Sequence, residues 1–532
     1  MSLVQRLAEL TVESRLTAEE AEAFSQKLRQ IGNFKVYSKS ITAREKALFF
    51  MISRSGSKSL GILSADSIPG PFSGTVHRML IEGVMTNLAI CPLTSENAAA
   101  LRGLFDFLVP KAFGISKSFG FGDRLGLATP GHIRAVRRVF GDDSTAIRPI
   151  FAQQSMRENA RTGRNPQSVQ DDALWGVFQE GWRAGFGADA DHLKTLEDID
   201  ACVKAGYTFF TVDPGDYVDE SAETASETEL REKASNLPWD YLETTLSDLV
   251  HELTAGDFNF GEFRFRFSEE EVIRAAVKYG RVVEHTVRMY RHLAELMGDK
   301  PFDLEMSVDE TNSVTTVAEH VFIATQMKRL GAHWVSLAPR YVGRFEKGVD
   351  YMGKPGTPIE EAVAEFERDF APHVAVARHL GPYKLSLHSG SDKFAVYPVY
   401  ARLAGDLVHV KTAGTSYLEA LRALSRIRPN LFRDILCFAL EHYAVDRATY
   451  HVSAEPSRVP DIGQLADEQL SGLLDDFHAR QALHVTFGSV LHDARFRIEL
   501  YEALRSNEEV YYSGLEEHFM KHVTPFANGT RG

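Results

Sequence analysis

Short runs of strand-forming residues alternate with amphipathic segments through the middle of this chain, and this alternation limits the possible folds most strongly. A weaker first run spans Ser118–Asp123, and seven further runs end at Ser155, Asp216, Thr311, Arg340, Ser391, Thr415 and Pro456. Segments with apolar residues at helical spacing follow most of them, for example over residues 189–206. Strands that alternate with helices pair in parallel, and eight such strands can close a barrel. The sequence therefore predicts an α/β fold of the TIM-like (β/α)8 type.

Three regions flank or interrupt the predicted catalytic barrel of residues 111–456. Residues 1–110 have mixed helix and strand patterns and are predicted to form an N-terminal α+β extension. Residues 217–300 form a predicted insertion after the third strand, with a long helix over Glu269–Met297. Residues 457–532 are predicted to be a helical C-terminal extension that packs on the barrel. A chain of 532 residues is long enough for a large barrel with such additions.

Composition argues against several classes of partner. The formal net charge of −14 disfavours a nucleic-acid partner, although a local basic pocket could still hold a small anion. We find no apolar run of 18 or more residues, so no membrane span is predicted. The three cysteines, Cys91, Cys202 and Cys437, form no CxxC pair, which argues against a thiolate metal site or a disulfide framework. This cysteine usage and the polar start of the chain predict a cytoplasmic protein.

Polar side chains recur on one face of the predicted strands, near the carboxyl end of each. Successive side chains of a strand point to opposite faces, so alternate residues can be grouped by face. The polar face contains Asp213, Asp303, Glu305, Ser307, Asp309, Lys384, Ser386, His388, His409 and Lys411. Buried polar groups are costly unless they pair, bind a metal or contact a substrate. Because chemistry in such barrels lies at the carboxyl ends of strands, His388–Lys393 is predicted to be a loop on the catalytic face.

A single one of these residues, such as Asp303, Glu305 or His451, could equally be a buried polar group that is paired within the core. The interpretation as a site therefore depends on the whole set. Its members fall at the same end of successive strands, at Asp213, Asp309, Glu310, Arg340, His388, Lys411 and Glu455.

One histidine among several carboxylates suits a divalent metal of the Mn, Co, Ni or Zn class. We predict His388, Asp309 and Glu305 as its ligands, which would leave coordination positions open for substrate oxygens. A bound metal can polarise a carbonyl group and stabilise an enolate. The predicted substrate contacts are the cations Arg124, Arg340, Lys393 and Lys411, which could hold a carboxylate or phosphate, together with Asp123, Gln154, Ser389 and Asp392. The set indicates a metal-dependent enzyme for a small polyhydroxy carbonyl acid, and leaves open isomerase, epimerase and aldolase.

Five blocks of the sequence resemble the tagaturonate epimerase family. They read FGDRLGLATPGH, MSVDET, RFEKGVDYMG, YKLSLHSGSDKFAVYP and VHVKTAGTSYLEALR. The resemblance extends from about Phe119 to Glu455. It implies a metal-dependent epimerase that interconverts D-tagaturonate and D-fructuronate in bacterial hexuronate catabolism.

The implied reaction limits the chemistry that the site must perform. The inverted carbon lies one position beyond the carbon next to the ketone, so simple enolisation cannot invert it. Retro-aldol cleavage and re-addition to the other aldehyde face can do so, as can oxidation and re-reduction by a held nicotinamide. The chain has no dinucleotide-binding fingerprint, which favours the retro-aldol route. That route needs a base and an acid, and we predict Asp213 and Glu310, on separate strands, for these roles.

Two alternative functions use the same features. A metal-dependent aldolase acting on a keto sugar acid would use the same site and release both fragments. A non-catalytic protein that binds sugar acids would need no acid–base pair. Analysis of the products distinguishes these possibilities.

Overall fold

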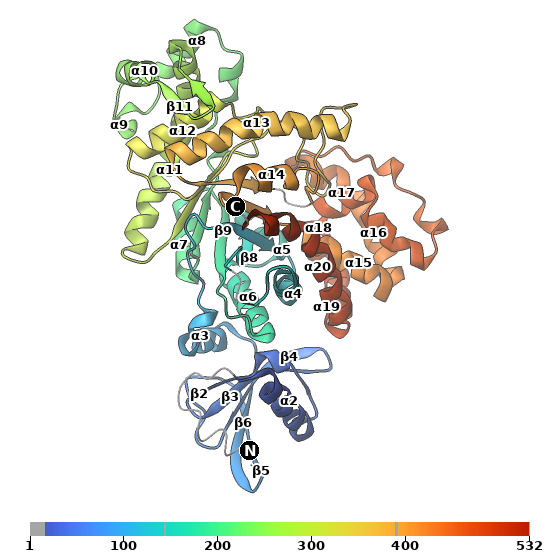
Figure 1. Cartoon of the computed structure of the whole chain (residues 1–532). Helices are drawn as coiled ribbons and strands as arrows, with labels where there is room; N and C mark the ends of the chain where they lie inside the picture. The colour runs from blue at the N-terminus through green and yellow to red at the C-terminus, as the bar shows by residue number, and fades with distance from the viewer. Residues whose placement is uncertain (1–15, 143–144, 389–391, 531–532) are drawn as a thin grey trace.

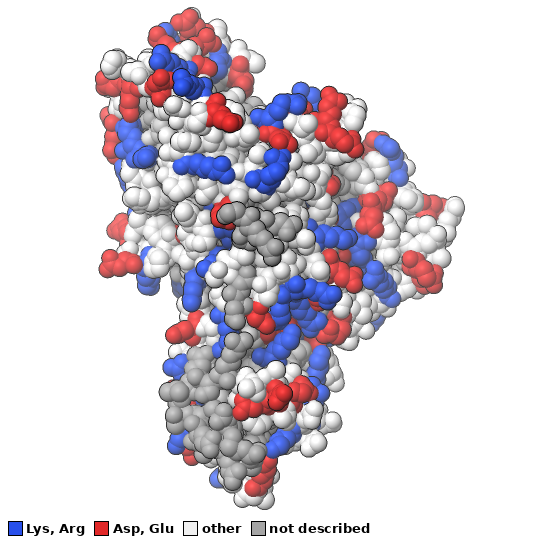
Figure 2. Space-filling view, in the orientation of Figure 1, with Lys and Arg blue, Asp and Glu red and all other residues white. Residues whose placement is uncertain are grey.

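The computed structural model describes residues 16–142, 145–388 and 392–530. Along the chain, an N-terminal sheet comes first, then a barrel, and then a group of C-terminal helices (Figure 1). The N-terminal sheet lies at one end of the molecule, the barrel in the middle, and the C-terminal helices beside the barrel. Acidic and basic side chains are interspersed on the face shown in Figure 2, so the negative net charge is distributed there rather than concentrated. Among the described residues, every helix is too short or too polar to cross a membrane.

Within the described residues, eight parallel strands close into a barrel in the order β10–β13–β14–β15–β16–β7–β8–β9. Their bounds are β7 Ser118–Gly122, β8 Arg148–Ser155, β9 Gly187–Leu193, β10 Phe209–Val212, β13 Asp303–Ser307, β14 Ser336–Ala338, β15 Lys384–His388 and β16 Val408–Thr412. The predicted TIM-like α/β fold is therefore confirmed.

One predicted strand is wrong, and one barrel strand was missed. Residues 450–456 contain no strand and lead into a short 3-10 turn, η6 (Pro456–Arg458). The eighth barrel strand is instead β9, whose sequence GADADHL lacks the β-branched and aromatic residues that favour strands. Pairing with β8 on one side and β10 on the other overrides that weak propensity. With β9 counted, the insertion of residues 217–300 follows β10, the fourth barrel strand in chain order.

Helices surround the barrel, and polar residues at their starts explain where several of them begin. The side chains of Thr195, Ser268 and Thr316 each accept a hydrogen bond from a backbone N–H in the first turn, as N-cap residues do. The helices in this part of the chain are α4 Thr129–Phe140, α5 Met156–Thr162, α6 Pro166–Glu180, α7 Leu196–Ala205, α11 Glu269–Met297, α12 Val317–Arg329, α13 Ile359–Leu380, α14 Tyr397–Ala404 and α15 Thr415–Ile427.

The barrel interior is polar, as the alternation along the strands predicts. Lys384 Nζ donates to Ser118 Oγ at 2.9 Å, and His409 Nδ1 lies 2.9 Å from the same oxygen. Their neighbours Leu385 and Val410 belong to the buried apolar core instead. Each strand therefore presents apolar side chains to one face and hydrogen-bonded polar side chains to the other.

The N-terminal extension is an antiparallel sheet, in the order β1–β3–β4–β6–β5 with β2 beside β3, covered by helices. Its elements are α2 Ala18–Gly32, β1 Lys35–Val36, η1 Ser38–Ser40, β2 Thr42–Arg44, β3 Ala47–Arg54, β4 Ser57–Ser64, β5 Thr75–Ile81, β6 Val84–Cys91, α3 Ser95–Leu104 and η2 Asp106–Leu108. The insertion before α11 contains η3 Gly215–Tyr217, η4 Glu220–Glu223, α8 Glu227–Ser235, α9 Trp239–Leu242, α10 Leu246–Ala255, β11 Phe258–Phe260 and β12 Phe263–Phe265.

The C-terminal part of the chain is helical in the described residues. Its elements are α16 Pro429–Asp446, η5 Arg447–Thr449, η6, η7 Ile462–Gln464, η8 Asp467–Leu474, α17 Phe477–Val485, α18 Phe487–His492, α19 Ala494–Ser506, α20 Glu508–Val523 and η9 Thr524–Thr530. Helix α20 packs against α4 and α15, so the last long helix of the chain lies beside the first barrel helix (Figure 1).

Candidate active site

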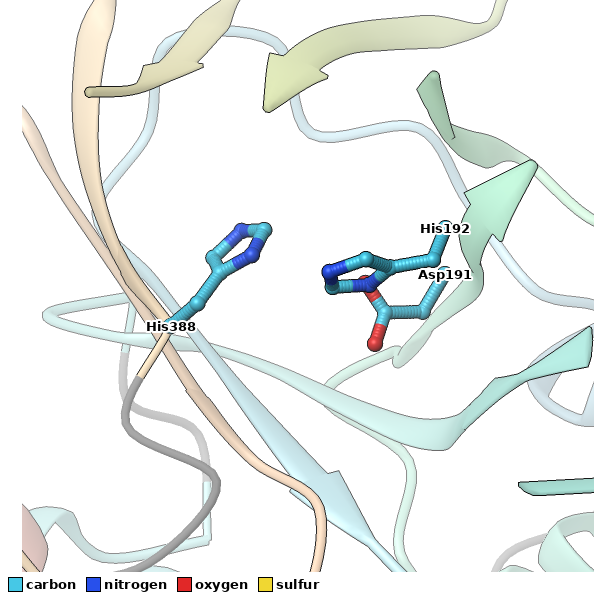
Figure 3. Close-up of side chains that lie close together, drawn as sticks. All are labelled: Asp191, His192 and His388. Atoms are coloured by element: carbon cyan, nitrogen blue, oxygen red, sulfur yellow. The ribbon is translucent and has the colours of Figure 1, made fainter. Parts of the chain in front are cut away.

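The carboxyl end of β9 carries two adjacent functional side chains, Asp191 and His192. The register with β10 shifts between Phe210 and Val212, which marks a bulge in this pair of strands. His192 has a φ of 55°, a left-handed conformation that is rare outside glycine and tends to occur at functional sites. A bulge redirects side chains, so both residues face the barrel mouth although neighbours in a regular strand point apart (Figure 3).

His388, at the end of β15, faces His192 across the mouth of the barrel (Figure 3). The two ring centroids are 5.2 Å apart. Asp309 Oδ1 approaches both rings, at 3.3 Å from His388 Nδ1 and 3.7 Å from His192 Nε2. One ligand atom each from Asp191, His192 and His388 also lie within 4.8 Å of one another. The predicted ligands His388 and Asp309 are thus brought together, with a second histidine beside them.

The carboxylates around the two imidazoles favour positive charge. Burial lowers the pKa of His388, but Asp309 and Glu305 outweigh it and raise this pKa to about 9. Burial likewise opposes protonation of His192, while Asp191 raises the pKa of that ring well above its usual range. An electrostatic environment that stabilises an imidazolium also stabilises a metal cation at the same place.

The donor atoms present fit the predicted metal. Both ring nitrogens of His192 are buried and make no hydrogen bond with the described residues. Nδ1 lies 2.9 Å from Asp191 Oδ1, but this contact lacks hydrogen-bond geometry. A buried nitrogen without a partner costs free energy unless a ligand satisfies it. Imidazoles together with carboxylates are donors that the Mn, Co, Ni and Zn class accepts.

Glu305 and Lys411 form a buried charged cluster next to His388. Glu305 Oε1 accepts a hydrogen bond from His388 Nε2 at 2.7 Å and lies 2.9 Å from Lys411 Nζ. Lys411 Nζ also lies 2.8 Å from Asp189 and 2.9 Å from Asp191. These carboxylates raise the pKa of Lys411 although burial lowers it. Glu305 therefore orients the His388 ring, and Lys411 is the shared counterion of three buried acidic side chains.

Two adjoining cavities open beside the histidines and share Lys347, His388 and Tyr450. The first is lined in addition by Asp309, Glu310 and Arg340, and the second by Arg124, Asp191, His192 and Lys411. The candidate metal ligands and several cations therefore line the same pair of adjoining cavities, where a small anionic substrate could contact both.

The predicted acid–base residues lie around His192. One ligand atom each from His192, Asp213 and Glu310 are within 4.8 Å of one another. Burial raises the pKa of Asp213. Burial also opposes ionisation of Glu310, but Lys347, His192 and Arg157 outweigh it and lower the pKa of this carboxyl to about 2. Glu310 lies 3.4 Å from Lys347 and 3.0 Å from Arg157, so the protein holds it as a carboxylate.

Besides Lys411, two of the predicted substrate cations line the cavities, and they differ in whether the guanidinium already has a partner. The guanidinium of Arg340 has no hydrogen-bond or ion-pair partner among the residues described, and burial lowers its pKa. The guanidinium of Arg124 forms an ion pair with Glu158 at 2.6 Å and lies over the ring of Phe487. Arg340 is therefore the better placed of the two to bind an external anion.

Three predicted contacts lie outside the lining of both cavities. Asp123 accepts backbone hydrogen bonds from residues 125–128 and stabilises the turn after β7. Lys393 donates to main-chain oxygens in residues 346–349. Gln154 is buried, and its side-chain amide has no hydrogen-bond partner among the described residues. The side chains of Asp123 and Lys393 are thus used within the protein, and that of Gln154 is buried outside both cavity linings.

Asp392 lies in a separate buried cluster that involves the C-terminal extension. Its Oδ1 lies 3.0 Å from His518 Nε2 and 3.1 Å from His522 Nε2, and its Oδ2 accepts from Arg480 at 2.8 Å. Through these contacts Asp392 connects the segment after β15 to Arg480 of α17 and to the two histidines of α20. The predicted contact Ser389 is outside the described residues.

Sequence reasoning missed Asp191, His192, Lys347 and Tyr450. The first two were hidden because β9 was assigned to the following helix. An adjacent Asp and His at the end of a short run before a capped helix was the available signal. Lys347 and Tyr450 lie in irregular segments, where periodicity indicates no direction for a side chain.

Comparison with known proteins identifies the family. Residues 37–526 match the family described as tagaturonate epimerase. This chain belongs to the tagaturonate epimerase family. It is 41% identical over 490 residues to the tagaturonate/fructuronate epimerase of Thermotoga maritima. The aligned residues cover 92% of this chain and 96% of that protein. Membership makes the chain an epimerase, within the isomerase class.

Solved structures agree with this assignment. The native crystal structure of the fructuronate-tagaturonate epimerase UxaE from Cohnella laeviribosi is 35% identical, with a TM-score of 0.83 over 95% of this chain and 99% of that one. A structure of the same protein with one glycerol bound has a TM-score of 0.84 at 34% identity, over 96% and 99% of the two chains. The family match therefore includes the barrel and both extensions.

Proposed function

We propose that this epimerase interconverts D-tagaturonate and D-fructuronate and that it depends on a divalent metal. The proposal is supported by the family match together with one geometric observation. Two imidazoles and a carboxylate, from His192, His388 and Asp309, face one another at the mouth of the barrel. They border cavities that are also lined by the Glu310 carboxylate and by the Arg340 guanidinium, which has no partner among the described residues.

His192 and His388 would hold the metal, with Asp309 or Asp191 as the carboxylate ligand. Glu305 would not bind the metal itself. Its carboxylate accepts the Nε2 hydrogen of His388 and would thereby hold the imidazole ring in position for the metal. When bound, the metal would polarise the substrate ketone and stabilise the negative charge that develops during cleavage.

Arg340 is the proposed contact for the substrate carboxylate, and Lys347 and Arg157 supply positive charge nearby. Arginine can bind a carboxylate through two parallel N–H donors. Lys411 is less suitable for this role, since its ammonium group already contacts three carboxylates. The substrate would then lie with its carboxylate toward Arg340 and its ketone toward the histidines.

The proposed route is retro-aldol cleavage followed by aldol addition. Glu310, held as an anion, takes the proton from the hydroxyl of the carbon to be inverted. The bond between that carbon and the carbon next to the ketone breaks, and its electron pair passes to the keto fragment. The aldehyde then presents its other face and the bond re-forms. The new alkoxide takes a proton from Asp213, whose pKa is raised by burial.

Incubation of metal-reconstituted protein with each keto-uronate tests the function. We expect either sugar to yield a mixture of both, with no accumulation of shorter carbonyl compounds. Accumulation of two fragments would indicate an aldolase, and binding without turnover would indicate a sugar-acid-binding protein. Substrate deuterated at the inverted carbon tests the route. Retro-aldol chemistry does not break the C–H bond at that carbon, so we expect little primary isotope effect on turnover. A large primary effect would mean that this bond breaks, as it does in hydride transfer or direct deprotonation, and would contradict the proposed route.

A further inference from the structure

Helix α17 of the C-terminal extension lies directly against several loops at the carboxyl end of the barrel. Arg124, after β7, donates to the main-chain oxygen of His484 at 3.1 Å. Gly348, after β14, has a φ of 87°, and a Cβ atom at this position would lie 3.2 Å from Cα of Gln481. A Cβ atom on Gly414, after β16, would meet the His484 ring at 2.1 Å. Glycine at positions 348 and 414 allows these two loops to approach the helix this closely.

Gln481 is the residue of α17 that joins two of the segments lining the cavities. Its Oε1 accepts from the backbone N–H groups of Ser453 at 2.8 Å and Ala454 at 2.6 Å. Its Nε2 donates to Glu346 Oε2 and to the main-chain oxygen of Lys347, both at 3.0 Å. The side chain is fully buried. Both donors and both lone-pair directions of the amide are therefore used, and no water is available to replace them.

Each of the two segments carries a residue that lines both cavities. On one side this residue is Lys347, whose Nζ lies 3.4 Å from Glu310. On the other it is Tyr450, three positions before Ser453, whose ring lies 5.5 Å from the guanidinium of Arg157. Arg157 also pairs with Glu310, at 3.0 Å. The buried amide of Gln481 thus connects the segment of Lys347, which contacts Glu310, with the segment of Tyr450, which contacts Arg157.

We infer that Gln481 is a positioning residue of the epimerase. Helix α17 thus contributes to the site in two ways, because its His484 lines the second cavity directly. Gln481 holds the main chain of Lys347 so that its ammonium group stays beside Glu310. It also holds the segment that places Tyr450 against Arg157. The inference depends on the proposed function only in that Lys347 and Glu310 act on the substrate.

The test compares Gln481→Ala, Lys347→Met and the double variant in the full-length, metal-loaded protein. Displacement of a group by about 1 Å can cost roughly 10²-fold, so we expect a loss of this order in kcat/KM for each single variant. If Gln481 acts through Lys347, the double variant should be about as active as the weaker single variant. Losses that multiply would overturn the inference, because they would mean that Gln481 acts independently of Lys347.

A matched control separates positioning from general stability. Gln326 in α12 is equally buried and accepts from Arg329, but lines neither cavity. Gln326→Ala should lower the Tm without changing kcat/KM by more than about 2-fold. A comparable loss of activity in this control would assign the effect of Gln481→Ala to stability alone.

A second variant covers the case in which Gln481→Ala does not fold. Gln481→Glu keeps acceptors for Ser453 and Ala454 but removes both donors to the loop of Lys347. We expect it to fold and to lose activity with the same non-additivity toward Lys347→Met. A folded Gln481→Glu with wild-type kcat/KM would overturn the inference and leave the proposed function intact. Absence of epimerisation by the wild-type protein would instead overturn the proposed function.

Discussion

His388 donates its Nε2 hydrogen to Glu305 Oε1 at 2.7 Å, so the opposite ring nitrogen, Nδ1, is the one that faces Asp309. An ionised carboxylate can only accept, which fixes the tautomer of a neutral ring. The pair resembles the arrangement in which a carboxylate orients a metal-binding histidine. Glu305 thereby prepares His388 to offer Nδ1 to a cation at the barrel mouth.

Changing this pair should weaken metal binding to different extents. His388→Ala removes a ligand, and we expect the purified variant to lose both bound metal and activity. Glu305→Gln keeps the shape of the partner but removes its charge, and loss of such a partner typically lowers metal affinity by roughly 10–100-fold. Competition with a chelator measures both effects. A His388→Ala variant with full metal content and activity would exclude the residue as a ligand.

Lys411→Met should destabilise the fold rather than act first on substrate binding. The substitution leaves Asp189, Asp191 and Glu305 buried without their shared counterion. Breaking a buried ion pair in this way costs about 3–5 kcal/mol of unfolding free energy. Chemical denaturation measures the change, with Lys204→Met at an exposed position of α7 as the control. A Lys411→Met protein of unchanged stability would show that Lys411 is not needed as the shared counterion of these acidic side chains.

Arg340→Met should weaken substrate binding while leaving the fold stable, because the guanidinium has no partner among the described residues. Hydrogen bonds to charged groups contribute about 1.5–3 kcal/mol, so we expect affinity for the keto-uronate to fall by roughly 10–150-fold. Calorimetric titration of a Glu310→Gln background measures binding without turnover. Unchanged affinity would assign the substrate carboxylate to another cation.

Glu310→Gln should separate binding from catalysis. The amide occupies the same volume but cannot take a proton, and general acid–base assistance is worth roughly 10²–10⁴-fold in rate. We expect kcat to fall by that factor, whereas metal content and sugar affinity stay within a few-fold of wild type. Steady-state kinetics and metal analysis of one preparation check both. A variant that turns over normally would remove Glu310 from the mechanism.

Glu508 should make the contact between the N-terminal sheet and α20 sensitive to acid. Its carboxylate accepts from Tyr37 at 2.7 Å and lies 2.9 Å from Lys58. Burial opposes its ionisation, but Lys58 and the hydrogen bonds outweigh it and lower its pKa from 4.5 to about 2. A lowered pKa stabilises the folded protein above the unfolded-state value, and this contribution is lost as the pH falls through the folded-state value.

The matching measurement is the difference in Tm between wild type and Glu508→Gln across pH. We expect wild type to be the more stable protein above pH 4.5 and the difference to shrink as the pH approaches 2. A difference that stays constant over this range would show that Glu508 contributes no charge-dependent stability.

Periodicity predicted the fold class, seven of the eight barrel strands and part of the site. The alternation in β13 and β15 correctly grouped Glu305 and Ser307 on one face and Ser386 and His388 on another, and these faces meet inside the barrel. It also placed Asp309 and Arg340 at the catalytic end. It failed at β9, because GADADHL lacks strand-forming residues, its alternation of Ala and Asp spans only four positions, and a bulge turns two neighbours the same way.

The order of residues along the chain specified the fold class, because hydrophobic periods of two and of about four residues require strands and helices, and alternating strands and helices require a parallel sheet. It also specified the residue types available at the strand ends. Which of those side chains meet was decided only by the closed tertiary structure. Closure brings His192 to His388 and Lys411 to three carboxylates, and α17 approaches the Lys347 loop from more than a hundred residues away. These contacts depend on distances between segments remote in sequence, which no local pattern encodes.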